Sequence, residues 1–130
     1  MTNYNRAKQF YNKSENSHNQ VKDPLDMVRT MVLELNKSMK IVVECIKSKD
    51  KHMLKSKHFS KSLIIIYTLQ TTLDFDKGGK LATQLFQLYE YCRQQLLQGF
   101  TKNIYDNILK AIDSLDELFI NKENGKTETI

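Results

Sequence analysis

Turn-forming residues are scarce in this sequence of 130 residues, which holds four glycines and one proline. β-Sandwiches and β-barrels need turn residues roughly every 8–12 positions, so this scarcity excludes an all-β fold. The longest apolar run covers residues 63–67, far short of the roughly 20 residues of a membrane-spanning helix. Residues 1–20 are polar where a secretory signal would be apolar. We therefore expect a single cytoplasmic domain, whose 40% hydrophobic content suffices for one core.

Cysteine and histidine are also sparse, and their spacing argues against catalysis or metal binding. Cys45 and Cys92 do not form a Cys-x-x-Cys pair, so we expect buried free thiols rather than a disulfide or a zinc site. A phosphate-binding loop ending at Gly79-Lys80 fails, because position 74 is not Gly and position 81 is not Ser or Thr. The three histidines have no ligand-like spacing. We predict no catalytic residue, no metal, no cofactor and no enzymatic activity.

Apolar residues recur along the chain at steps of three and four, which is the spacing of one helix face. The pattern covers about residues 24–47, 50–73, 80–99 and 104–120. Leu81 and Ile104 are among the positions that it assigns to the core. Asp50 is a candidate N-cap and Gly99 a candidate helix stop. Helices of this length joined by short loops predict an all-α, antiparallel four-helix bundle.

The chain is divided by this prediction into three parts. Residues 1–22 form a flexible N-terminal tail or cap, able to fold into a short extra helix. Residues 23–121 form the helical bundle, which begins with Asp23 as a capping acid before Pro24 at the first helical position. Residues 122–130 form a disordered C-terminal tail.

The formal net charge of +5 comes from the N-terminal tail and from one short segment. Residues 47–61 hold six lysines and one acid, Asp50. Such a cluster binds phosphate backbones when it forms an exposed patch. Here it falls at a turn between two helices with Phe59 as its only aromatic residue, which favours a solvated turn.

Several apolar residues lie away from the predicted core stripes when successive residues are placed about 100° apart around the helix axis. They are Ile64, Ile65, Tyr67, Phe86, Leu97 and Leu109, with Tyr89 at the edge of the third stripe. A helix that is apolar nearly all round is covered on two sides. The apolar residues off the stripes are covered by the chain's own tail, by a second copy of the chain or by a foreign peptide. The alternative is that they reflect ordinary irregularity of the bundle.

Residues 73–91 read Leu-Asp-Phe-Asp-Lys-Gly-Gly-Lys-Leu-Ala-Thr-Gln-Leu-Phe-Gln-Leu-Tyr-Glu-Tyr. This segment resembles the signature of the FliS family of flagellar secretion chaperones, approximately L-D-x-[ED]-K-G-G-x-[IL]-A-x-x-L-x-x-L-Y-D-Y. The resemblance extends in weaker form over most of residues 4–120. The chain departs from the family in reading Met31-Val32-Leu33-Glu34 in place of L-Y-D-G, and in having no tryptophan. It is therefore similar to a divergent member.

The resemblance implies a helical bundle that binds the disordered C-terminal segment of flagellin in the cytosol, prevents its premature polymerisation and aids its delivery to the type III export apparatus. Other flagellar export components are further candidate partners. The off-stripe residues listed above then become the client-binding groove, and Tyr4, Phe10 and Tyr11 become candidates for a cap over it. Two alternatives stay open: a basic helical module that binds nucleic acid, and a self-associating bundle whose extra apolar face makes a homodimer.

Overall fold

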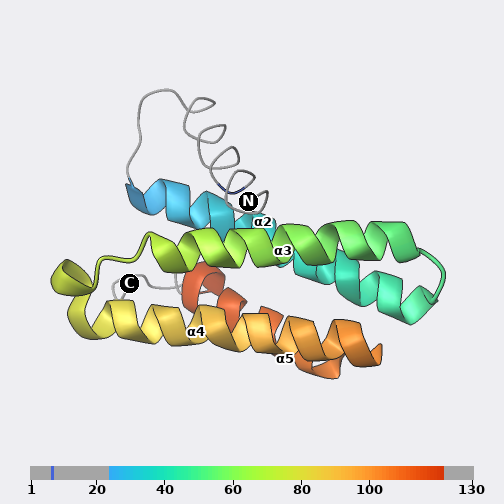
Figure 1. Cartoon of the computed structure of the whole chain (residues 1–130). Helices are drawn as coiled ribbons and strands as arrows, with labels where there is room; N and C mark the ends of the chain where they lie inside the picture. Colours follow the sequence, from blue (N-terminus) through green and yellow to red (C-terminus); the bar gives the residue numbers. More distant parts are fainter. Residues whose placement is uncertain (1–6, 8–23, 122–130) are drawn as a thin grey trace.

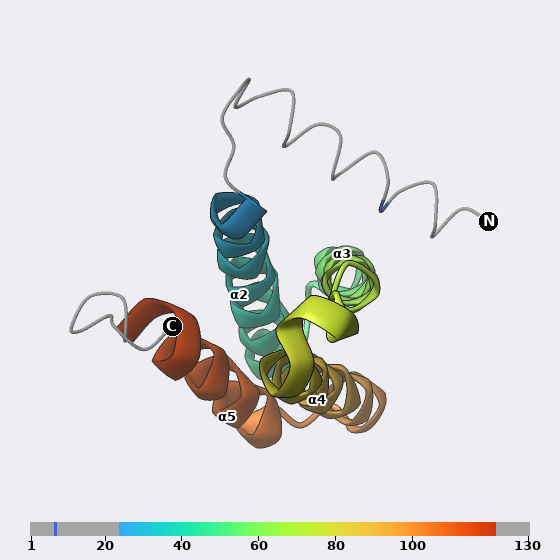
Figure 2. The same cartoon turned by 90° about the vertical axis from the view of Figure 1, so that its left-hand side faces the viewer.

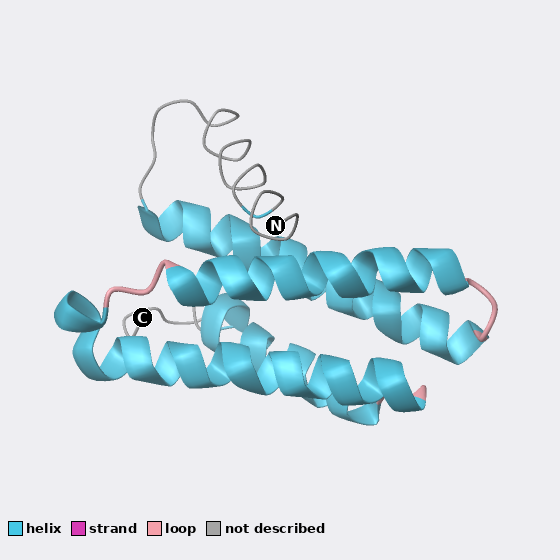
Figure 3. Ribbon diagram, viewed as in Figure 1, coloured by secondary structure: helices cyan, strands magenta, loops and turns pink. Residues whose placement is uncertain are grey.

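The computed structural model describes residue 7 and residues 24–121, and the predictions made for both tails fall outside these residues. The described chain forms four α-helices in antiparallel succession and contains no strand, as Figures 1 and 3 show. Their bounds are α2, Pro24–Ser48; α3, His52–Thr71; α4, Phe75–Lys102; and α5, Asp106–Leu115, continued by the π-helical segment η1, Asp116–Asn121. The predicted all-α bundle is confirmed. No described helix combines the length and apolar character needed to span a membrane.

The four helices form a closed ring around one core, seen end-on in Figure 2. α3 packs between α2 and α4, and α5 packs between α4 and α2. Buried side chains from all four helices meet inside this ring, and the largest include Tyr89, Met31, Leu35, Met39, Ile65, Ile66, Leu69, Leu96, Ile108 and Leu115. Cys45 and Cys92 are both buried and free, as predicted. Burial raises the pKa of the Cys92 thiol to about 12, so this thiol stays protonated.

The α2 helix follows its sequence pattern most closely. Asp26 lies in the first turn and Lys47 in the last, where each charge matches the helix dipole. The predicted stripe is buried from Met31 to Ile46, with Val28 packed at its edge. Asp50, by contrast, is not the N-cap of the next helix. The cap position of α3 is Lys51, which makes no side-chain capping hydrogen bond.

The start of α4 differs from the prediction because a helical turn precedes the glycine pair. Asp74 caps this turn by accepting a hydrogen bond from the backbone N–H of Lys77 at 3.0 Å. Gly79 then interrupts the helix with φ 51° and ψ −124°, a conformation that only glycine adopts without strain. Leu81, two residues after this kink, is exposed, whereas the sequence pattern placed it in the core.

The end of α4 also lies beyond its predicted position. The helix continues through Gly99 to Lys102, and Asn103 supplies the left-handed C-cap with φ 57°. Gly99 is required for packing instead: a Cβ there would stand 2.6 Å from the carbonyl oxygen of Ile104 and would clash with the side chain of Ile108. Glycine thus lets α5 approach α4 closely. Ile104, expected in the core, lies in the exposed loop between the two helices.

A buried amide on α2 is tied to the C-terminal end of α5. Asn36 is buried, and its Nδ2 donates a hydrogen bond to Oδ1 of Asp116 at 2.5 Å. A buried amide without a hydrogen-bond partner destabilises the fold. A shift of the last helix along α2 would break this hydrogen bond, so the pair favours one position of that helix.

Candidate protein-binding face

Two adjacent helices, α3 and α4, run side by side along one outer side of the bundle (Figures 1 and 2). On α4, the row at helical steps of three and four consists of Phe86, Glu90, Arg93, Leu97 and Phe100. On α3, the facing row consists of Phe59, Leu63, Tyr67 and Gln70. The two rows touch at two places, where Phe59 stacks on Phe100 and where Gln70 hydrogen-bonds to Glu90.

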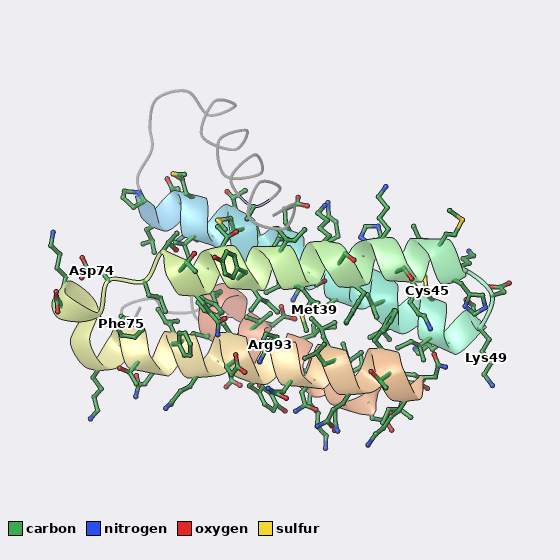
Figure 4. The ribbon with its side chains drawn as sticks, in the orientation of Figure 1. Met39, Cys45, Lys49, Asp74, Phe75 and Arg93 are labelled. Atoms are coloured by element: carbon green, nitrogen blue, oxygen red, sulfur yellow. The ribbon has the colours of Figure 1, made fainter. Side chains whose placement is uncertain are left out.

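Aromatic contacts define the two ends of this surface. The rings of Phe59 and Phe100 stack with centroids 3.9 Å apart and planes within 8°. At the other end, Phe75 in the first turn of α4 lies against Phe86, with centroids 6.1 Å apart. Figure 4 shows Phe75 at this end, and Arg93 farther along α4 on the side toward α3. We name the apolar members of this surface the α3–α4 apolar face: Phe59, Leu63, Tyr67, Phe75, Phe86, Leu97 and Phe100.

Much of the α3–α4 apolar face is open to solvent. Tyr67 is 47% exposed, Phe75 48% and Phe86 38%. Leu63 and Leu97 are half-buried. Exposed apolar surface that includes aromatic rings is typical of sites where a folded domain binds another polypeptide.

A polar network divides this apolar surface. Arg93 donates to both oxygens of Glu90, from Nε at 3.0 Å and from Nη2 at 2.7 Å. Gln94 donates to Oε2 of Glu90 at 3.0 Å, and Gln70 reaches across from α3 to donate to Oε1 at 3.2 Å. The hydrogen bonds from Arg93, and next those from Gln94, lower the pKa of Glu90 to about 2. We name these four residues the Glu90 network.

Three of the predicted groove residues belong to the α3–α4 apolar face, namely Tyr67, Phe86 and Leu97. Ile64 is half-buried and lies farther around α3, away from α4. Leu109 is exposed on α5, which packs on α4 and α2, so it lies apart from this face.

Two of the predicted groove residues are inside the core, and their placement on the surface was wrong. Ile65 is 0% exposed and Tyr89 is 1% exposed. Ile65 is buried because the buried side of α3 runs through Ser62, Ile65, Ile66 and Leu69, and so includes a position that the predicted stripe left out. Burial also raises the pKa of the Tyr89 hydroxyl. Neither side chain is available to a partner in this structure.

The predicted cap cannot be placed on this surface, and some residues of the surface were not predicted. Tyr4, Phe10 and Tyr11, the predicted cap, lie outside the described residues. Phe75 was not predicted, because the glycine pair suggested a loop at this point. The pairing of Glu90 with Arg93 is visible in the sequence as a spacing of three, but nothing in the sequence indicated that Gln70 would join them.

The lysine-rich turn joins α2 to α3, and three lysines of residues 47–61 have internal partners. Lys47 lies 5.2 Å from the centre of the Tyr105 ring. Lys55 is buried, donates to Oδ1 of Asn103 at 2.7 Å, and lies 5.1 Å from the centre of the Phe100 ring. Lys61 pairs with Glu34 on α2 at 3.2 Å. The one aromatic residue of the segment, Phe59, is stacked on Phe100 and so is not free to stack on a base.

Metal-binding groups of histidine, cysteine and carboxylate residues are absent from the residues that the structure describes. The fold and the α3–α4 apolar face together define a small helical bundle suited to binding another polypeptide.

Comparison with known families identifies the family to which this helical bundle belongs. The family model described as "Flagellar protein FliS" matches residues 7–120, which is most of the chain. The protein therefore belongs to the FliS family, a family of flagellar export chaperones, and the resemblance seen over residues 73–91 is confirmed. No curated protein and no solved structure matches the chain.

Proposed function

We propose that this protein is a cytosolic chaperone that binds the disordered C-terminal segment of flagellin, prevents its premature polymerisation and aids its delivery to the export apparatus. The observation that carries the proposal is the exposed α3–α4 apolar face in a chain of the FliS family. On this face, Tyr67, Phe86 and Leu97 are the proposed client contacts. Ile64 and Leu109 lie off the face and are proposed to contact other parts of a client that wraps around the bundle.

A disordered client loses conformational entropy when it binds, so the host has to offer enough apolar surface to offset that loss. Full burial of a phenylalanine side chain contributes about 1.5–3 kcal/mol. Tyr67, Phe75 and Phe86 are each close to half exposed, so covering one of them contributes about 1 kcal/mol by the same measure. Three exposed rings and two half-buried leucines on one surface therefore offer several kcal/mol to a client helix.

Two features of the proposal remain predictions from the sequence. One is that Tyr4, Phe10 and Tyr11 cover the client site when no client is bound. The other is a homodimer formed through the same apolar surface. Light scattering with and without client tests the dimer: a dimer that dissociates when client is added supports a shared surface.

The test is isothermal titration of the protein with the C-terminal segment of flagellin from the same organism, at low and high salt. We expect saturable one-to-one binding with a negative heat-capacity change and little dependence on salt. Binding to nucleic acid, in contrast, weakens steeply with salt. No heat at any concentration would remove the proposed function and leave the fold and family as they are.

Phe86→Glu tests the location of the site, because the substitution removes one exposed ring and adds a charge to the face. We expect at least a tenfold loss of affinity, about 1.4 kcal/mol, with unchanged helical circular dichroism. The matched control is Leu33→Glu, which changes an exposed apolar residue on α2 in the same way. Wild-type affinity in Phe86→Glu would show that the client does not bind on the α3–α4 apolar face.

A further inference from the structure

The Glu90 network lies between two apolar parts of the same surface. Along α4, Phe86 precedes Glu90 by one helical turn and Leu97 follows it by two, at a rise of about 1.5 Å per residue. The apolar positions at 86 and 97 are thus about 16 Å apart along the axis, with the network between them. A client helix that contacts both apolar parts also has to pass over the network.

The carboxylate of Glu90 has no capacity left for a client. A carboxylate offers about four acceptor positions. Oε1 accepts from Gln70 and from Nε of Arg93, and Oε2 accepts from Nη2 of Arg93 and from Gln94. These four hydrogen bonds hold the network in one geometry before any client arrives.

The groups that remain open include both acceptors and a donor. Within the described part of the chain, the side-chain carbonyl oxygens of Gln70 and Gln94 and the Nη1 of Arg93 make no hydrogen bond to the protein. Glu90 and Arg93 are both partly exposed, so water reaches these groups in the free protein. A client side chain that covers them has to replace that water.

The chemistry of the replacement follows from these open groups. An apolar client residue leaves the amide oxygens and the arginine N–H without partners, and binding sites built for hydrogen bonding reject such analogues. A charged residue is disfavoured too, because it loses its hydration on covering the network and gains no net attraction from the paired, neutral Glu90 and Arg93. A neutral amide or hydroxyl can both donate and accept.

We propose that the Glu90 network selects the register of the client by requiring an Asn, Gln, Ser or Thr side chain between two apolar anchors of the bound segment. The inference rests on the proposed function and adds to it the chemistry that the client must carry. The apolar parts of the face contribute affinity, and the network fixes the register in which the segment binds along α3 and α4.

The test replaces each Asn, Gln, Ser and Thr of the flagellin C-terminal segment singly by Leu and titrates each peptide against the wild-type protein. We expect one position, or two adjacent ones, at which Leu weakens binding about tenfold or more. The Glu90→Leu/Arg93→Leu double variant, which keeps the net charge, should abolish or reverse that preference. Gln98→Leu, on the exposed side of α4, is the matched control and should leave the preference unchanged.

The outcomes separate the two proposals. If the wild-type protein does not bind the unsubstituted segment, the proposed function fails and the inference fails with it. If the segment binds but no position shows the loss, or if the loss persists in the double variant, only the inference is overturned. Gln70→Leu is a second variant, altered on α3 alone, that should weaken the preference even if the double variant does not fold.

Discussion

Replacing Gly99 by alanine tests the reasoning about how α4 and α5 pack. Alanine is the better helix former by about 1 kcal/mol, so on propensity alone the variant would be more stable. The added Cβ, however, would stand 2.6 Å from the carbonyl oxygen of Ile104 and 2.8 Å from Cγ1 of Ile108. The backbone of Ile104 cannot turn away easily, because its N–H bonds to the carbonyl oxygen of Gly99 at 3.1 Å.

The balance of these two effects gives the expected magnitude. Overpacking a close contact costs about 1–3 kcal/mol, and contact with backbone rather than with a flexible side chain places this site in the upper part of that range. We expect Gly99→Ala to lower the free energy of unfolding by about 1–2 kcal/mol, measured by urea denaturation followed by circular dichroism. Thr101→Ala, exposed in the same part of α4, is the control and should change stability little. A Gly99→Ala variant as stable as the wild type would refute the claim that glycine is needed for close packing.

Two further predictions concern α3. Ile66→Asp places a carboxylate at a fully buried position and should abolish the far-ultraviolet helical signal at neutral pH; a folded variant would show that Ile66 is not in the core. His58 has its pKa lowered, chiefly by burial and then by Lys61 and Lys57. As pH falls below the unfolded-state value of 6.5, the unfolded chain binds a proton that the folded protein does not, so stability decreases until the lowered folded pKa is reached. His58→Gln should flatten this decrease in urea unfolding between pH 7.5 and 5.5, and an unchanged slope in the variant would contradict the assignment.

The helical architecture could be predicted from the sequence because each helix shows the periodicity of at least one buried face. The prediction was most accurate for α2, whose single stripe runs from Met31 to Ile46. It was least accurate for α3, whose buried side runs through Ser62, Ile65, Ile66 and Leu69, whereas the predicted stripe included Leu63 and Gln70, which are only partly buried. Ile65 was placed on the surface for this reason.

The ends of α4 were misplaced because glycine has more than one role. Gly79 produces a kink inside the helix, and Gly99 allows close packing of another helix. The residue that ends α4 is Asn103, which also adopts the left-handed conformation. Sequence alone does not distinguish these roles, because they depend on which helix lies nearby.

The candidate site was predicted in part. Tyr67, Phe86 and Leu97 were recognised because their helical phase excludes them from the core stripe. Phe75 was missed because its position depends on the turn that Asp74 caps. The Glu90 network was missed because it needs Gln70 from another helix, and such a contact is known only once the two helices are placed side by side.

The two ends of the bundle differ in the contacts that hold their helices together. At the end where α2 joins α3, the Lys55–Asn103 hydrogen bond, the stacked ring of Phe59 and the cation of Lys47 over the Tyr105 ring tie separate helices together. At the opposite end, α4 begins with an exposed turn that Gly79 separates from the rest of the helix. Local unfolding therefore costs least at this second end, and amide hydrogen exchange along α4 should slow progressively from Phe75 toward Gly99. The α3–α4 apolar face thus runs from the end of the bundle that resists local unfolding most to the end that resists it least.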